Sequence, residues 1–108
     1  MLLTEILAAL PFPTAETYFT QQPSGVFGVY GEKIVADGSD FDNEVRTHFV
    51  TIDLCEPLLN PQPSAHDALQ SVLDDNGIPW TKSERMLWQD ERLFYTTYTF
   101  NYTERRPQ

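Results

Sequence analysis

The side chains that could form a nucleophile and its base are few and lie far apart along the chain. Such a site needs a thiol or hydroxyl beside an imidazole, and the candidates are Cys55, His48 and His66. His48 and Cys55 fall in one expected strand, where a rise of about 3.3 Å per residue separates them by more than about 20 Å. His66 is expected at the solvated start of a helix. The sequence therefore predicts no enzyme, and Cys55 is interpreted as a small core or strand-end residue.

One dense cluster of carboxylates remains, formed by Asp37, Asp40, Asp42 and Glu44. A calcium loop of the EF-hand type needs Gly at its sixth position and Glu at its twelfth, but counting from Asp40 these are Val45 and Thr51. The cluster is interpreted as an exposed acidic loop, with a weak cation site as the alternative. The sequence also lacks a glycine-rich phosphate loop, so we predict neither a metal nor a cofactor.

Charge and cysteine content limit the possible partners. The formal net charge is −9, and residues 1–78 hold twelve acidic and two basic side chains. This balance argues against wrapping DNA or docking on an anionic membrane, because phosphate binding needs clustered Lys and Arg. The single cysteine excludes an internal disulfide and fits a reducing cytosol. No apolar run approaches the roughly 18 residues that span a membrane.

The elements that must position these side chains form one α+β domain over residues 1–108, with an antiparallel sheet and two helices packed on one of its faces. Hydrophobic periodicity predicts the order α-β-β-β-α-β-β, with helices over 2–10 and between Ser64 and Gly77, and strands over 26–30, 33–36, 44–55, 80–88 and 92–102. Ser64 is the expected N-cap and Gly77 the left-handed residue after the helix. Residues 37–43 are expected as a loop and 103–108 as a frayed end.

The hairpin over 80–102 is rich in aromatic residues, which suggests either stacking on single-stranded nucleic acid or self-association. The acidic balance argues against nucleic acid. Aromatic residues on both faces of the last strand would leave some of them exposed in so small a domain. We therefore expect Trp88, Tyr95 and Tyr98 to form an interface between copies.

The order of motifs resembles one family of small virion proteins. An aromatic strand ends at Tyr30, and Val50-Thr51-Ile52-Asp53-Leu54 forms the next recognisable strand. A capped helix ends in Asp75-Asn76-Gly77-Ile78 and is followed by Trp80-Thr81-Lys82-Ser83-Glu84 and a Tyr-rich strand. Over residues 25–103 this is similar to the tail terminator or tail-completion (head-tail joining) proteins of long-tailed phages and Gram-positive prophages. The segment from Cys55 to Pro61 departs from the family in replacing a more charged connector.

The resemblance implies a structural protein of the virion, assembled in the cytoplasm of the bacterial host. Its partners would be other copies of itself in a homo-oligomeric, commonly hexameric, ring, the tail tube protein and the head connector or head-completion protein. DNA would pass through the ring without specific binding, and the acidic loop at Asp37, Asp40, Asp42 and Glu44 would face that passage. The alternative, from the acidic charge, is a DNA mimic that inhibits a host nucleic-acid enzyme. A third reading, a small metal-dependent enzyme, depends wholly on the loop over residues 37–44.

Overall fold

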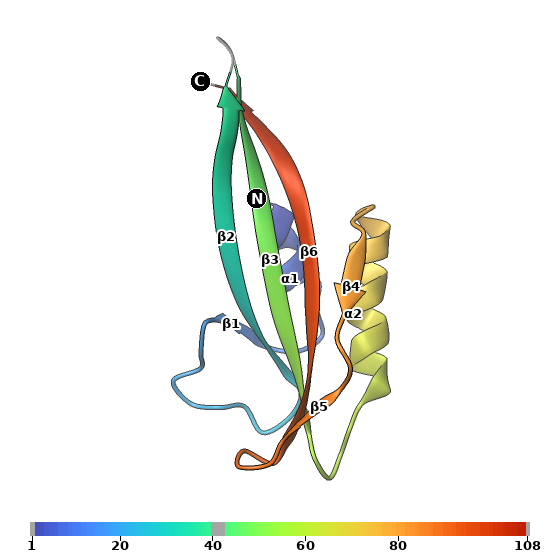
Figure 1. Ribbon diagram of the computed structural model, residues 1–108. Coiled ribbons are helices and arrows are strands. Elements are labelled where there is room, and N and C mark those ends of the chain that lie inside the picture. Colours follow the sequence, from blue (N-terminus) through green and yellow to red (C-terminus); the bar gives the residue numbers. More distant parts are fainter. Residues whose placement is uncertain (1, 40–42, 108) are drawn as a thin grey trace.

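The computed structural model describes residues 2–39 and 43–107 (Figure 1). The elements in chain order are α1 (Leu2–Ala8), β1 (Thr14–Glu16), β2 (Phe27–Ser39), β3 (Asn43–Pro57), α2 (Pro63–Asp75), β4 (Trp80–Lys82), β5 (Met86–Trp88) and β6 (Leu93–Pro107). The predicted fold class is confirmed: two helices accompany a mostly antiparallel sheet in the order α-β-β-β-α-β-β, if β4 and β5 are counted as one strand. The first of the three strands before α2 is β1, which the sequence does not predict. The predicted strand over 80–88 is present as two short strands, β4 and β5.

The sheet has the order β1-β2-β3-β6-β4, and β5 also pairs with β6. The pairing of β1 with β2 is parallel and all other pairings are antiparallel. β3 is central, because β6 pairs with it over its whole length, from Asn43 opposite Pro107 to Pro57 opposite Leu93. These long strands give the molecule an elongated shape of 54 × 27 × 23 Å.

Three strand boundaries differ from the sequence prediction. The strands expected over 26–30 and 33–36 are one strand, because Gly31 continues the ladder opposite Thr51 instead of starting a connection. β2 then runs to Ser39 and β3 begins at Asn43, so residues 37–39 and 43 of the expected loop lie in strands. Residues 103–107 are not a frayed end, since β3 supplies a partner for each of them. In each case pairing with β3 overrides the local sequence signal.

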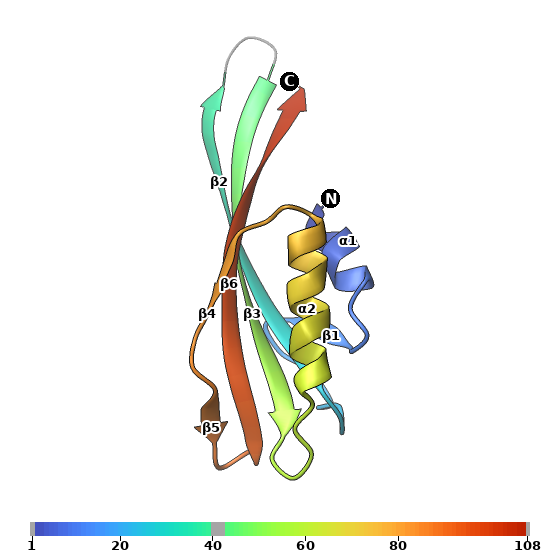
Figure 2. The ribbon, with the colours of Figure 1, turned by 90° about the vertical axis from the view of Figure 1, so that its right-hand side faces the viewer.

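The core lies between the helices and one face of the sheet, and both helices pack on that same face (Figure 2). Val50, Ile52 and Leu54 of β3 are fully buried there, as their predicted alternation requires. The partners that cover them come from both helices and from β6, namely Leu3, Ile6, Leu69, Leu73, Tyr98 and Phe100. The opposite face of the sheet carries no helix (Figure 2).

The end of α2 is closed as the sequence predicts. Gly77 has a φ of +67°, in the left-handed region that favours glycine. The Gly77 N–H donates to the Asp74 carbonyl at 2.9 Å, and the Ile78 N–H donates to the Leu73 carbonyl at 3.0 Å. These two bonds define a Schellman closure, which returns Ile78 to the core.

The start of α2 differs from the prediction. Ser64 was expected as the N-cap, but the cap position is Gln62, and Pro63 occupies the first helical position. Proline suits that position because its missing N–H would have no partner there in any case. No side chain caps the helix at Gln62, and the Gln62 N–H itself donates to the Glu56 carboxylate at 2.8 Å.

Past the pairing with β1 and β4, the sheet narrows to a three-stranded blade, which we define as residues 31–39 of β2, 43–51 of β3 and 101–107 of β6. The base of the blade, with Val50 and Tyr102, is still covered by the helices, and its tip extends beyond them (Figure 2). β1 pairs with β2 only up to Tyr30, and β4 pairs with β6 only at Trp80–Lys82 opposite 98–100. Among the described residues, the blade therefore has β2 and β6 as its two outer strands.

Candidate functional site

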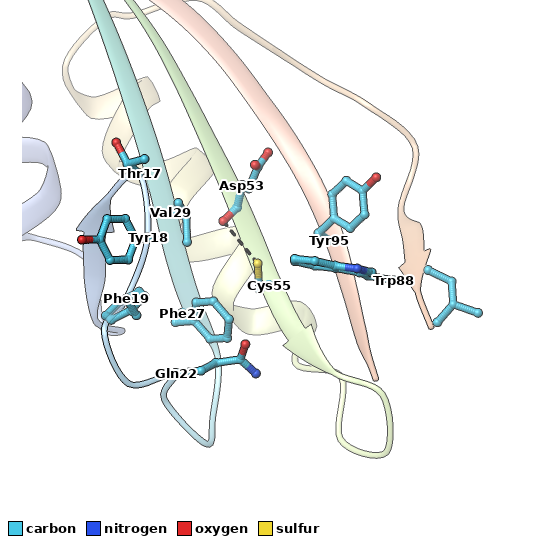
Figure 3. Close-up of a pocket in the computed structure, with 11 residues that line it drawn as sticks. Thr17, Tyr18, Phe19, Gln22, Phe27, Val29, Asp53, Cys55, Trp88 and Tyr95 are labelled. Atoms are coloured by element: carbon cyan, nitrogen blue, oxygen red, sulfur yellow. Dashed lines mark hydrogen bonds between the residues drawn. The ribbon is translucent and has the colours of Figure 1, made fainter. Parts of the chain in front are cut away.

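The uncovered face of the sheet holds an apolar groove of about 530 Å³ at the end of the molecule opposite the blade (Figure 3). Its walls are the segment 17–22 on one side and β5 on the other, and β2, β3 and β6 form its floor. Because opposite residues of paired strands share a face, Phe27, Cys55 and Tyr95 lie in a row across the floor.

The floor of the groove is well packed. Phe27, Cys55 and Leu93 are buried and form a second small core, on which Phe19 packs. The rings of Phe19 and Phe27 meet edge to face with centroids 5.4 Å apart, a favoured geometry for aromatic pairs. The segment 17–22 is therefore held against the sheet, and the groove is a formed feature of the folded chain.

The rim of the groove exposes large apolar side chains. Tyr18 is 70% exposed, Leu87 52% and Trp88 49%. The Trp88 ring stands edge-on to Tyr95 with centroids 6.4 Å apart, so the two predicted interface residues are brought together (Figure 3). Aromatic groups gathered on an uncovered face are typical of protein interfaces, where Trp and Tyr are enriched.

Tyr98 is not part of this surface, and its assignment to an interface is wrong. Side chains alternate along a strand, so Tyr98 and Tyr95, three positions apart, point to opposite faces of β6. Tyr98 is fully buried beneath α2. Its hydroxyl lies 2.8 Å from His66 Nδ1 and accepts a hydrogen bond from Gln70 Nε2 at 2.9 Å.

His66 belongs to a partly buried chain of polar side chains that the sequence reading missed. It was expected to be solvated, yet its Nε2 lies 2.7 Å from Oε1 of Glu56, a carboxylate with only 1% exposure. Both ring nitrogens of His66 have a partner if the Tyr98 hydroxyl donates to Nδ1 and the Nε2–H donates to the Glu56 carboxylate. Burial is the main cause that raises the pKa of Tyr98, and the charge of Glu56 adds to it. This polar chain links β3, α2 and β6, and no local sequence signal predicts it.

His48 forms a second buried cluster at the base of the blade. Its Nδ1 lies 2.6 Å from Glu32 Oε2 and its Nε2 lies 2.7 Å from Glu104 Oε1. Its ring stacks on Tyr102 with centroids 4.5 Å apart. Burial is the main cause that raises the pKa of Tyr102, whose hydroxyl accepts the Leu3 N–H. The cluster joins all three strands of the blade through side chains.

Cys55 and the two histidines do not form a catalytic pair. Cys55 lies on the uncovered face, whereas His48 and His66 are bonded on the helix-covered side. Burial, with a smaller contribution from the Asp53 charge, raises the pKa of the Cys55 thiol to about 12. The thiol is therefore protonated at neutral pH, as expected for a small core residue.

Part of the expected acidic loop belongs to the strands of the blade. Asp40 and Asp42 lie outside the described residues, and Asp37 and Glu44 are placed only by their backbone, in β2 and β3 at the tip of the blade. Within the described part of the chain, no three His, Cys, Asp or Glu side chains converge as a metal site.

No protein-family model matches the chain, and no curated protein matches its sequence. None of the described helices has the length and hydropathy needed to cross a membrane.

Proposed function

We propose that the protein is a structural subunit that assembles with copies of itself into a ring, and that this ring caps a phage tail tube and joins it to the head connector. The observation that supports self-assembly is the apolar groove with Trp88, Tyr18 and Leu87 on its rim. The resemblance in the order of motifs supports the place of the ring in a virion assembled in the host cytoplasm.

Burial of the groove would favour association. A large apolar side chain contributes about 1.5 to 3 kcal/mol when it is fully buried, so three that are about half exposed or more offer roughly 1 kcal/mol each. Trp88 and Tyr18 stand on opposite walls of the groove, so a partner seated in it would contact both, and exposed Trp and Tyr side chains often dominate the binding energy of an interface. A partner that covers the groove would therefore gain several kcal/mol from this region.

The net charge of −9 suits the proposed passage of DNA. A negative lumen repels the phosphate backbone and keeps the genome from binding in transit. Under the proposal, Asp37, Asp40, Asp42 and Glu44 face that passage from the tip of the blade.

The test compares two variants by multi-angle light scattering and negative-stain imaging, alone and with purified tail tubes. Trp88→Ala should raise the protein concentration needed for assembly at least tenfold, because it removes the largest side chain on the rim. Leu59→Ala is the matched control, since Leu59 is 83% exposed but does not line the groove. A wild-type protein that stays monomeric at millimolar concentration and does not bind tail tubes would refute the proposal.

A further inference from the structure

We propose that copies join through their blades: the outer edge of β2 in one copy pairs in parallel with the outer edge of β6 in the next. The inference deepens the proposed function and rests on its self-assembly: it adds, at the end of the molecule opposite the groove, the strand junction that would set how neighbouring copies are joined. Among the described residues, nothing pairs with β2 beyond Tyr30 or with β6 beyond Phe100 on these outer sides.

The backbone groups that β2 presents at this edge follow from its bonds nearer the groove. The Gly28 N–H donates to the Pro13 carbonyl and the Tyr30 carbonyl accepts the Thr17 N–H, each at 2.9 Å, so both residues direct their polar groups away from β3. This direction alternates along a strand, and the register of β2 against β3 is unbroken as far as Ala36. The residues with outward N–H and C=O groups in the blade are therefore Glu32, Ile34 and Ala36.

The edge of β6 is read in the same way. The Thr97 N–H donates to Ser83 Oγ at 3.0 Å and the Thr97 carbonyl accepts the Ser83 N–H at 2.9 Å, so Thr97 points its polar groups away from β3. By the same alternation, Asn101 and Thr103 direct theirs outward in the blade. Each copy thus carries two edges with unpaired donors and acceptors at similar heights along β3.

Strand direction selects the way in which the edges meet. β2 and β6 are both antiparallel to β3, so they run parallel to each other. Rotation about an axis along the blade keeps that direction, and it brings the β2 edge of one copy against the β6 edge of the next. Such a head-to-tail contact closes into a ring when the rotation closes. Six copies would supply about 18 strands, a number at which barrels enclose an aqueous channel.

The edges also lack most of the features that block pairing. Natural edge strands are usually protected by lysines, prolines, bulges or a covering segment. Over residues 31–36, β2 carries one lysine, Lys33, and its bulge lies further on, between Ala36 and Ser39. On β6, the proline is at 107, beyond the proposed contact. A six-residue stretch of β2 is therefore open to a second strand.

The test uses proline to remove one outward N–H from each edge. Ile34→Pro and Thr103→Pro should both fold, because proline is tolerated where the N–H of an edge strand faces solvent. Each should abolish ring formation in native mass spectrometry. The controls Ile34→Thr and Thr103→Val keep the N–H and a β-branched side chain, and both should assemble as the wild type does.

Mixing the two blocked variants identifies the geometry. Ile34→Pro retains the β6 edge and Thr103→Pro retains the β2 edge, so the mixture should form a one-to-one dimer while each variant alone stays monomeric. Self-dimers of Thr103→Pro would indicate a twofold β2–β2 contact and overturn the inference. Wild-type rings formed by Ile34→Pro would overturn it while leaving the proposed function standing. A wild type that is monomeric under all conditions would remove both.

Hydrogen exchange on the wild-type protein gives a second measurement that does not depend on how proline is tolerated. Assembly should protect the amides of Ile34 and Thr103 at least tenfold, whereas the Val35 amide faces β3 and should already be protected in the monomer. Rings in which the Ile34 and Thr103 amides still exchange quickly would contradict the proposed junction.

Discussion

Replacing Gly77 with valine should destabilise the protein by about 2 kcal/mol through backbone strain alone. A Cβ at this position would meet nothing within 4 Å, so the added Cβ itself causes no steric clash. The cost comes from the φ of +67°, since a residue other than glycine held there costs about 1 to 3 kcal/mol and a β-branched one lies at the upper end. Replacing glycine also lowers the conformational entropy of the unfolded chain, which offsets roughly 0.5 kcal/mol of this cost. At about 4 °C per kcal/mol for a chain of this length, the melting midpoint should fall by about 8 °C.

Gly25 provides a control with the same open space around its Cβ position but without a positive φ. A Cβ there also meets nothing within 4 Å, but Gly25 does not have a positive φ. Gly25→Val should therefore change stability by less than about 0.5 kcal/mol. Gly77→Asn should lose less than Gly77→Val, because asparagine tolerates the left-handed region. Equal losses for the two valine variants in urea and thermal melts would refute the assignment of the cost to φ.

Three further predictions concern buried and acidic groups. Tyr98→Phe should cost about 2 kcal/mol in urea melts, because the groups bonded to its hydroxyl lose a partner, and an unchanged midpoint would contradict the polar chain. The pKa of Cys55 is raised from 9.0 to about 12 in the folded protein, so the unfolded chain binds fewer protons above pH 9. Stability should thus fall by about 1 kcal/mol more between pH 9 and 10 than it does in Cys55→Ala, and identical pH profiles would refute this. Changing Asp37, Asp40 and Asp42 to Asn should leave melting and assembly nearly unchanged but slow DNA release from virions. Wild-type release kinetics would remove the lumen assignment.

The parts of the fold that sequence predicts are those with local signals. The closure of α2 is encoded within Asp75-Asn76-Gly77-Ile78, and the buried face of β3 follows from the alternation of Val50, Ile52 and Leu54. The extent of β6 is not predictable in this way. Pro107 is ordered by a partner at Asn43, far away in sequence, and the segment itself has no strong strand pattern.

The sequence predicts only the part of the candidate site that depends on local contacts. Trp88 and Tyr95 lie close in one hairpin, so their contact is a local property. Tyr98 was assigned to the wrong face of β6. Side chains alternate along a strand, so a residue three positions after Tyr95 points to the opposite face. The environments of His48 and His66 depend on strands and a helix that come together only in the folded chain.

The central position of β3 has a consequence for synthesis. β2 reaches the ribosome exit before β3 and can pair with it at once, but the other neighbour of β3 consists of residues 93–107. Until those residues emerge, one edge of β3 is unsatisfied and the core lacks Tyr98, Phe100 and Tyr102. At about 5 to 20 residues synthesised per second this interval lasts seconds, and unpaired strand edges make folding intermediates prone to aggregate. During that interval the β6 of another copy can pair with β3. Strand exchange between copies is therefore the misfolding route to which this topology is exposed during synthesis.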